Sequence, residues 1–148
     1  MFKATLLFLM ILAGPSFADF GCYRFFYVKR PVAFGTVYHE YVVAQREDLR
    51  ESKAFGLLKG TDDLKHFLIA VKNPAKTDLK IKMLGRSCEA NAERALSRAN
   101  DASQEWTLFY ENELYFVTRM GLTPLIGKPC RNMALSIAEM IEPLLERP

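Results

Sequence analysis

The stretch that decides the fold is CYRFFYVKRPVAFGTVYHEYVVA, residues 22–44, which contains two segments with strong β-strand character. Residues 22–29 are aromatic and β-branched, and in residues 36–44 the side chains that would face the two sides of a sheet alternate. Pro31 and Gly35 mark a turn between the two segments. Strand-like runs joined by a short turn are typical of a β-hairpin, so we expect an antiparallel pair at the start of the folded domain.

Three segments beyond the hairpin have the periodicity of helices. In residues 61–71 apolar side chains recur every three or four positions after a threonine that can cap the helix, although residues 66–71 would also suit a short buried strand. A second helix is expected over residues 87–100, with Ser87 as its cap. Pro129 fits the first turn of a third helix.

Three further strands are expected to complete the sheet. Residues 79–84 alternate apolar and mainly basic side chains, while residues 105–110 and 114–119 flank a short polar turn and predict a second hairpin. Residues 46–58 are polar at first and then apolar, which indicates a weak helix followed by a loop. Together these segments predict a single α+β domain with about five mainly antiparallel strands and about three helices packed on one face.

Residues 1–18 have the three parts of a secretory signal peptide. Lys3 is their only charged residue, residues 4–13 form a ten-residue apolar core, and small side chains precede the expected cleavage point after Ala18. A membrane-spanning helix needs roughly 20 apolar residues, about twice the length of this core. We therefore expect residues 19–148 to be a single mature domain in the periplasm or outside the cell, with no transmembrane segment after cleavage.

The charge of the chain is small but unevenly distributed. The formal net charge is +3, and loss of residues 1–18 removes one lysine and no acid, which leaves +2. This is too little to indicate a nucleic-acid partner. Residues 59–88 carry seven basic and three acidic side chains, whereas residues 89–113 carry six acidic and two basic ones. If the two blocks lie on opposite sides of the domain, they create a dipole that steers a charged partner.

Three cysteines are present, Cys22, Cys88 and Cys130, and a single disulfide can be made from them in three ways. Residues 85–88 and 127–130 both have the form Gly-basic-x-Cys, and each stands at the start of an expected helix. This parallel favours a Cys88–Cys130 disulfide that ties two helix N-termini together. This disulfide would close a loop of about forty residues, which contributes roughly 3–4 kcal/mol to stability in the chain-entropy model.

The mature chain is rich in aromatic residues, more so than a core of this size normally needs. Tyr23, Phe25 and Tyr27 share one face of the first expected strand, and Trp106 and Tyr110 share a face of the last expected hairpin. Aromatic side chains dominate the centres of protein interfaces. These residues predict a binding surface, so the favoured function is an exported domain that binds another envelope or secreted protein as an inhibitor, an immunity-type protein or an assembly accessory.

Cys130 supports an alternative function, a small thiol-dependent or hydrolytic enzyme. A thiol at a helix N-terminus beside Lys128 and Arg131 favours the nucleophilic thiolate form, with His39 or His66 as the base. No metal or cofactor is expected, because the chain has no Cys-x-x-Cys, no His-Glu-x-x-His and no phosphate-binding glycine loop.

A second alternative is an envelope component anchored by a lipid on Cys22. This cysteine lies just beyond the expected cleavage point, where lipidated cysteines are found. Of the three residues before it, Asp19, Phe20 and Gly21, only Gly21 suits a lipoprotein signal.

Overall fold

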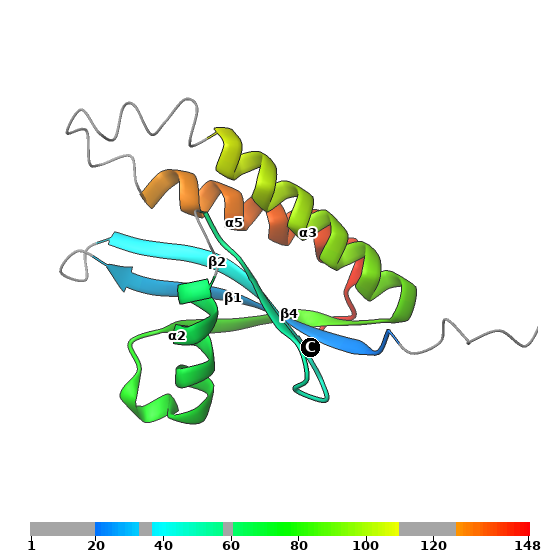
Figure 1. Cartoon of the computed structure of the whole chain (residues 1–148), viewed down its shortest axis with the longest axis horizontal. Helices are drawn as coiled ribbons and strands as arrows, with labels where there is room; N and C mark the ends of the chain where they lie inside the picture. Colours follow the sequence, from blue (N-terminus) through cyan, green and yellow to red (C-terminus); the bar gives the residue numbers. More distant parts are fainter. Residues whose placement is uncertain (1–19, 33–36, 58–60, 110–126) are drawn as a thin grey trace, which may run out of the picture.

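The computed structural model describes residues 20–32, 37–57, 61–109 and 127–148. They form one α+β domain built on a single antiparallel sheet with the strand order β3-β2-β1-β4 (Figure 1). The strands are β1 (Cys22–Val32), β2 (Val37–Arg46), β3 (Ser52–Phe55) and β4 (Lys80–Cys88). The expected fold class is confirmed, with four strands in these residues rather than five. The expected signal peptide, residues 1–18, lies outside the described part of the chain.

β1 and β2 form the expected hairpin, but the helix expected within residues 46–58 is wrong. A tight turn begins there instead, in which the Arg46 backbone N–H donates to the Glu51 carbonyl at 2.9 Å. The Asp48 carboxylate accepts a hydrogen bond from the Arg50 backbone N–H at 3.0 Å. Local side-chain bonds of this kind compete with helix formation. The chain therefore reverses, and β3 pairs with β2.

Helices cover both faces of the sheet (Figure 1). They are α2 (Thr61–Lys72), α3 (Glu89–Phe109) and α5 (Gly127–Ile141), with short 3₁₀ turns at Pro74–Lys76 and Glu142–Leu144. α3 and α5 lie side by side over one face, while α2 packs on the other. The expected helices are thus divided between two faces, because alternate positions of β1 and β2 supply two separate apolar clusters. None of the helices in the described residues is long and apolar enough to cross a membrane.

α3 is longer than the sequence predicts because its apolar stripe continues. Alanines are buried at helical spacing from Ala92 to Ala102, and half-buried Trp106 extends the stripe by one turn. The strand expected at residues 105–110 is therefore wrong as far as it is described, since that segment is helical. The strand expected at residues 114–119 lies outside the described residues.

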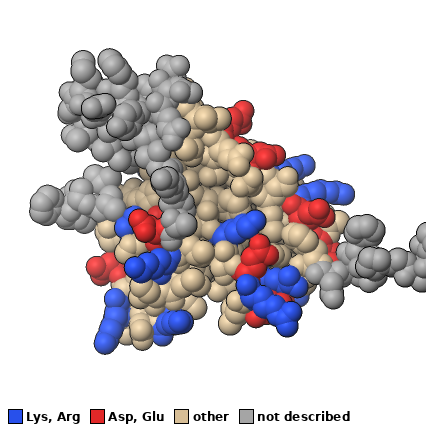
Figure 2. Space-filling model, in the orientation of Figure 1, with Lys and Arg blue, Asp and Glu red and all other residues tan. Residues whose placement is uncertain are grey.

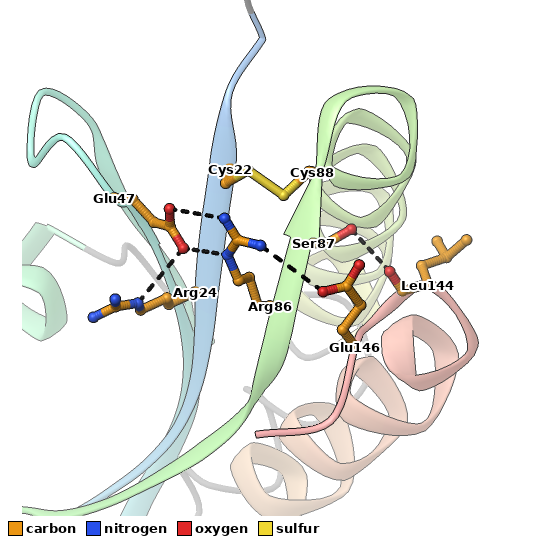
Figure 3. The surroundings of a disulfide bond; sticks show 8 residues. All are labelled: Cys22, Arg24, Glu47, Arg86, Ser87, Cys88, Leu144 and Glu146. Carbon is orange, nitrogen blue, oxygen red and sulfur yellow. Dashed lines mark hydrogen bonds and ion pairs between the residues drawn. A yellow bond between two sulfur atoms is a disulfide. The ribbon is translucent and has the colours of Figure 1, made fainter.

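A disulfide between Cys22 and Cys88 joins the ends of β1 and β4 (Figure 3). The two residues are directly opposite in the ladder, and their Cα atoms are 4.0 Å apart. The expected Cys88–Cys130 disulfide is therefore wrong. β4 continues through Ser87 and Cys88 instead of ending before them, and Cys130 is a free, buried thiol on α5. Ser87 caps no helix, and its hydroxyl donates to the Leu144 carbonyl at 2.8 Å.

The C-terminal segment is tied to the same corner of the sheet. Arg86 and Glu146 exchange two backbone hydrogen bonds of 2.9 and 2.7 Å, which form an isolated bridge on the outer edge of β4. The Arg86 guanidinium also forms ion pairs with the carboxylates of Glu47 and Glu146 (Figure 3). This end of the sheet is therefore held by a covalent bond and by polar contacts.

Candidate functional site

Three chemically active side chains from three elements meet toward the other end of β1 and β2. The Cys130 sulfur on α5 lies 3.3 Å from Nδ1 of His39 on β2, and Nε2 of the same ring lies 2.9 Å from Oδ2 of Asp63 on α2. Cys130 and Asp63 are 5% and 2% exposed, whereas the His39 side chain keeps 15% of its surface exposed. His39 thus links a thiol to a carboxylate in series, and solvent reaches the group at the imidazole.

The position of His39 in the sheet explains why helices from both faces reach it. β1 lies on one side, where Arg30 is the register partner of His39. β3 lies on the other side but ends opposite Val42, so in the described part of the chain no strand continues beside His39. This uncovered edge leaves room for side chains from both layers. α2 supplies Asp63 from one face and α5 supplies Cys130 from the other.

Asp63 is held from several sides. The Arg30 guanidinium lies 3.6 Å from its carboxylate, and the Tyr41 hydroxyl donates to its backbone carbonyl at 3.1 Å. Gly56 leaves the space that the carboxylate occupies, because a Cβ atom at that position would overlap Oδ2. A buried carboxylate is costly unless cations and hydrogen-bond donors surround it. The surroundings of Asp63 meet that requirement with His39 and Arg30.

The environment of His39 keeps its imidazole protonated. Burial on its own lowers the pKa of His39. Hydrogen bonds to Asp63 and Cys130, together with the negative charge of these partners, outweigh burial and raise the pKa from 6.5 to about 9. At neutral pH both ring nitrogens therefore carry protons, so that Nδ1 donates to the sulfur and Nε2 to the carboxylate. The protonated ring therefore lies as a hydrogen-bond donor against the Cys130 sulfur in the first turn of α5.

A thiol, an imidazole and a carboxylate in series are the groups of a nucleophilic triad. In such triads the sulfur attacks the substrate, the imidazole moves protons, and the carboxylate orients the ring and stabilises its charge. His39 uses both of its nitrogens within the series, so the three side chains do not converge on one point as metal ligands do. Across the residues that the structure describes, no group of three or more His, Cys, Asp and Glu side chains is placed to hold a metal ion.

Sequence reasoning found two members of this triad and missed the third. Of the two histidines considered as the base, His39 contacts Cys130, whereas His66 is exposed on α2. Asp63 is a typical helix-start residue in sequence, and its acidic neighbour Asp62 suits the same role. Its helical spacing does offer a signal, because Asp63 lies on the same buried stripe of α2 as Phe67. A carboxylate in a buried stripe requires a partner.

The aromatic residues of the first strand do not form a surface. Tyr23, Phe25 and Tyr27 are buried in the cluster that α3 and α5 cover, so the binding surface expected there is wrong. Trp106 is half-buried on α3, and Tyr110 lies outside the described residues. The high aromatic content is explained instead by the two apolar faces of the sheet, each of which packs against a helix layer.

The sequence matches no family model, and comparisons with curated proteins and with solved structures also find no match. The function therefore has to be inferred from the site itself.

Proposed function

We propose that this protein is an exported thiol-dependent enzyme that transfers or hydrolyses acyl groups. The observation that carries the proposal is the series of contacts from the Cys130 sulfur to His39 and from His39 to Asp63. In it, Cys130 is the nucleophile, His39 is the acid and base, and Asp63 orients and stabilises the imidazolium.

The chemistry follows from the protonation state of the site. The Cys130 thiolate attacks the carbonyl carbon of an ester, thioester or amide and forms a tetrahedral intermediate. His39 Nδ1–H then donates its proton to the leaving group, whose bond to the carbonyl carbon breaks, and an acyl-thioester remains on Cys130. A water molecule, deprotonated by the now neutral imidazole, attacks this thioester and releases the acid, which restores the thiolate–imidazolium pair.

Export fits both the sequence and the cysteine chemistry. Residues 1–18 have the composition of a cleavable signal, and the disulfide between Cys22 and Cys88 is typical of an oxidising compartment. The disulfide also occupies the sulfur that a lipid anchor on Cys22 would require. These observations support the proposal that residues 19–148 form a mature domain in the periplasm or outside the cell.

The proposal is tested by the reactivity of Cys130 in the folded protein. Iodoacetamide at about pH 7 is expected to modify one thiol, at least about tenfold faster than in His39→Gln or Asp63→Asn. A panel of p-nitrophenyl esters and thioesters then tests for turnover, which Cys130→Ala abolishes. His66→Gln is the matched control and leaves both rates unchanged. A thiol that reacts only after unfolding, or equally fast in all the variants, would show that Cys130 is structural.

Binding to another envelope or secreted protein stays a prediction. The first-strand residues on which that hypothesis depended are buried, so the first hairpin does not provide the expected binding surface. The two functions separate in one comparison. Cys130→Ala keeps the fold and loses function if the protein is a thiol enzyme, whereas a binding protein tolerates the same substitution.

A further inference from the structure

α2 has an outer face that the fold leaves uncovered. Its inner face, with Phe67 and Ala70, is buried against the sheet. Within one turn on the outside, Leu68, Ile69 and Val71 keep 38%, 50% and 47% of their surface exposed. Contiguous exposed apolar surface on a small domain marks an interaction site.

Lysines adjoin this apolar surface. Lys65, Ile69 and Lys72 follow one helical stripe beside Leu68, and these residues, together with Val71, are called the α2 outer face below. Lys76, in the 3₁₀ turn that follows α2, is a third exposed lysine at the end of this helix. In the described part of the chain, none of these three lysines forms an ion pair with a carboxylate. Figure 2 shows basic side chains at the corner of the molecule that contains α2.

Acidic side chains lie on the other side of the sheet. α3, which packs on the face opposite to α2, carries exposed carboxylates that include Glu93, Asp101 and Glu105. Asp62 and Asp78 are the exposed acids near α2 and are outnumbered by the lysines there. The sheet therefore separates Lys65 and Lys72 of α2 from these carboxylates of α3. This separation of charge favours the approach of α2, rather than α3, to a negatively charged surface.

We propose that the α2 outer face binds the surface of an anionic lipid bilayer, with α2 lying along the headgroups. Aliphatic side chains beside lysines on one exposed helical face are the arrangement of an interfacial helix. Lysine stems lie along the apolar surface while their ammonium groups reach the lipid phosphates. Juxtaposed basic residues add electrostatic attraction to anionic lipids.

The composition of the face favours a bilayer over an acidic protein. The centres of protein interfaces are enriched in aromatic residues and depleted in lysine. The α2 outer face has the opposite composition, with Leu68, Ile69 and Val71 next to Lys65 and Lys72 and no aromatic side chain among them. The inference does not depend on the reaction at Cys130, because these side chains point away from the sheet that carries His39.

The experiment is co-sedimentation of the full chain with vesicles of phosphatidylcholine, alone or with about 30% phosphatidylglycerol. We expect binding to the anionic vesicles, and a partition coefficient that falls at least about tenfold without phosphatidylglycerol, in about 0.5 M NaCl, or in the variant Lys65→Gln/Lys72→Gln. Leu68→Gln/Ile69→Gln weakens binding similarly, because it removes the apolar contact. All variants share the same N-terminus, so differences between them report on α2.

Matched controls distinguish vesicle binding through this face from binding caused by the net charge of the protein and from nonspecific adsorption to lipid. Arg94→Gln/Arg98→Gln removes the same charge from exposed positions on α3, and binding stays within about twofold of the wild type. Equal binding to neutral vesicles, equal loss in the α3 control, or no vesicle binding at all would overturn the proposal. Retention on immobilised poly-glutamate without vesicle binding would also overturn it and would assign the face to an acidic protein. Loss of Cys130 reactivity leaves these results unchanged, so the two proposals fail independently.

Discussion

At the scale of single residues, the site depends on one imidazole, because His39 alone contacts both other members of the triad. Its charge is stabilised by Asp63 and by the Cys130 sulfur only when the chain is folded. Folding and protonation of His39 are therefore coupled, and the stability of the protein must depend on pH through this residue.

The sign of that dependence follows from the raised pKa of His39, about 9 in the folded chain against 6.5 for an unperturbed histidine. The stabilising contribution is fully present below pH 6.5 and is lost as the pH rises through about 9. It amounts to about 3 kcal/mol, since each pKa unit corresponds to about 1.4 kcal/mol. We expect the free energy of unfolding in urea to fall by that amount more in the wild type than in His39→Gln over this range.

His66→Gln serves as the control for this measurement, because His66 is exposed on α2 and contacts no member of the triad. It retains the pH dependence of the wild type. An identical pH profile for the wild type and His39→Gln would contradict the coupling and would show that the imidazole gains nothing from its partners on folding.

The residue types of the site could be predicted, but their pairing could only be predicted in part. Cysteine and histidine are reactive residue types in any protein, so the sequence alone could indicate Cys130 and His39 as a candidate nucleophile and a candidate base. Asp63 is recognisable only from its place on the buried stripe of α2, since an acid at a helix start is common. The contact between α5 and the edge of β2 depends on where β3 ends, which no local pattern encodes.

At the scale of elements, the approach of α2 to the end of β3 decides where Asp63 lies. Gly56 follows β3 directly, and its missing side chain makes room for the Asp63 carboxylate. Gly56→Ala is therefore expected to push α2 or its carboxylate away. It should lower the free energy of unfolding by about 1–3 kcal/mol, typical of overpacking, and slow the alkylation of Cys130 about tenfold.

A double-mutant cycle with Asp63→Asn tests whether Gly56→Ala acts through the carboxylate. If it does, the two substitutions together slow alkylation no more than Asp63→Asn alone, because each removes the same interaction. Effects that multiply would instead place the influence of Gly56 elsewhere, for example in the backbone hydrogen bond that its carbonyl accepts from the Ser103 hydroxyl.

Elements with a long, regular pattern were predictable and their boundaries were not. The hairpin expected within residues 22–44, the helix α2 and the strand β4 have clear alternation or helical periodicity, and the structure confirms each. β3 was missed because it is four residues long and follows a polar turn. Cys88 is expected in a helix because Ser87 before it suits a cap position, whereas strand pairing with β1 extends β4 through both residues.

At the scale of the whole molecule, the two ends of the sheet differ: one is cross-linked, and the other carries the candidate site. The disulfide of Cys22 and the ion pairs of Arg86 fix one end, and the triad around His39 lies toward the other. Cys22 and Arg30 are eight positions apart on β1, a distance of roughly 27 Å in an extended strand. The disulfide sulfurs are thus kept away from the free Cys130 thiol, which disfavours thiol–disulfide exchange within the chain.

That separation predicts the state of the thiols in the protein recovered from its own compartment. Intact mass after alkylation should show a chain that begins at Asp19, with one modified thiol before reduction and three after it. One modified thiol is expected before reduction because the disulfide protects two sulfurs while Cys130 remains free. Three modified thiols without reduction would remove the disulfide and the argument for an oxidising compartment. A chain that begins at a lipidated Cys22 would place the protein on a membrane through its N-terminus rather than through α2.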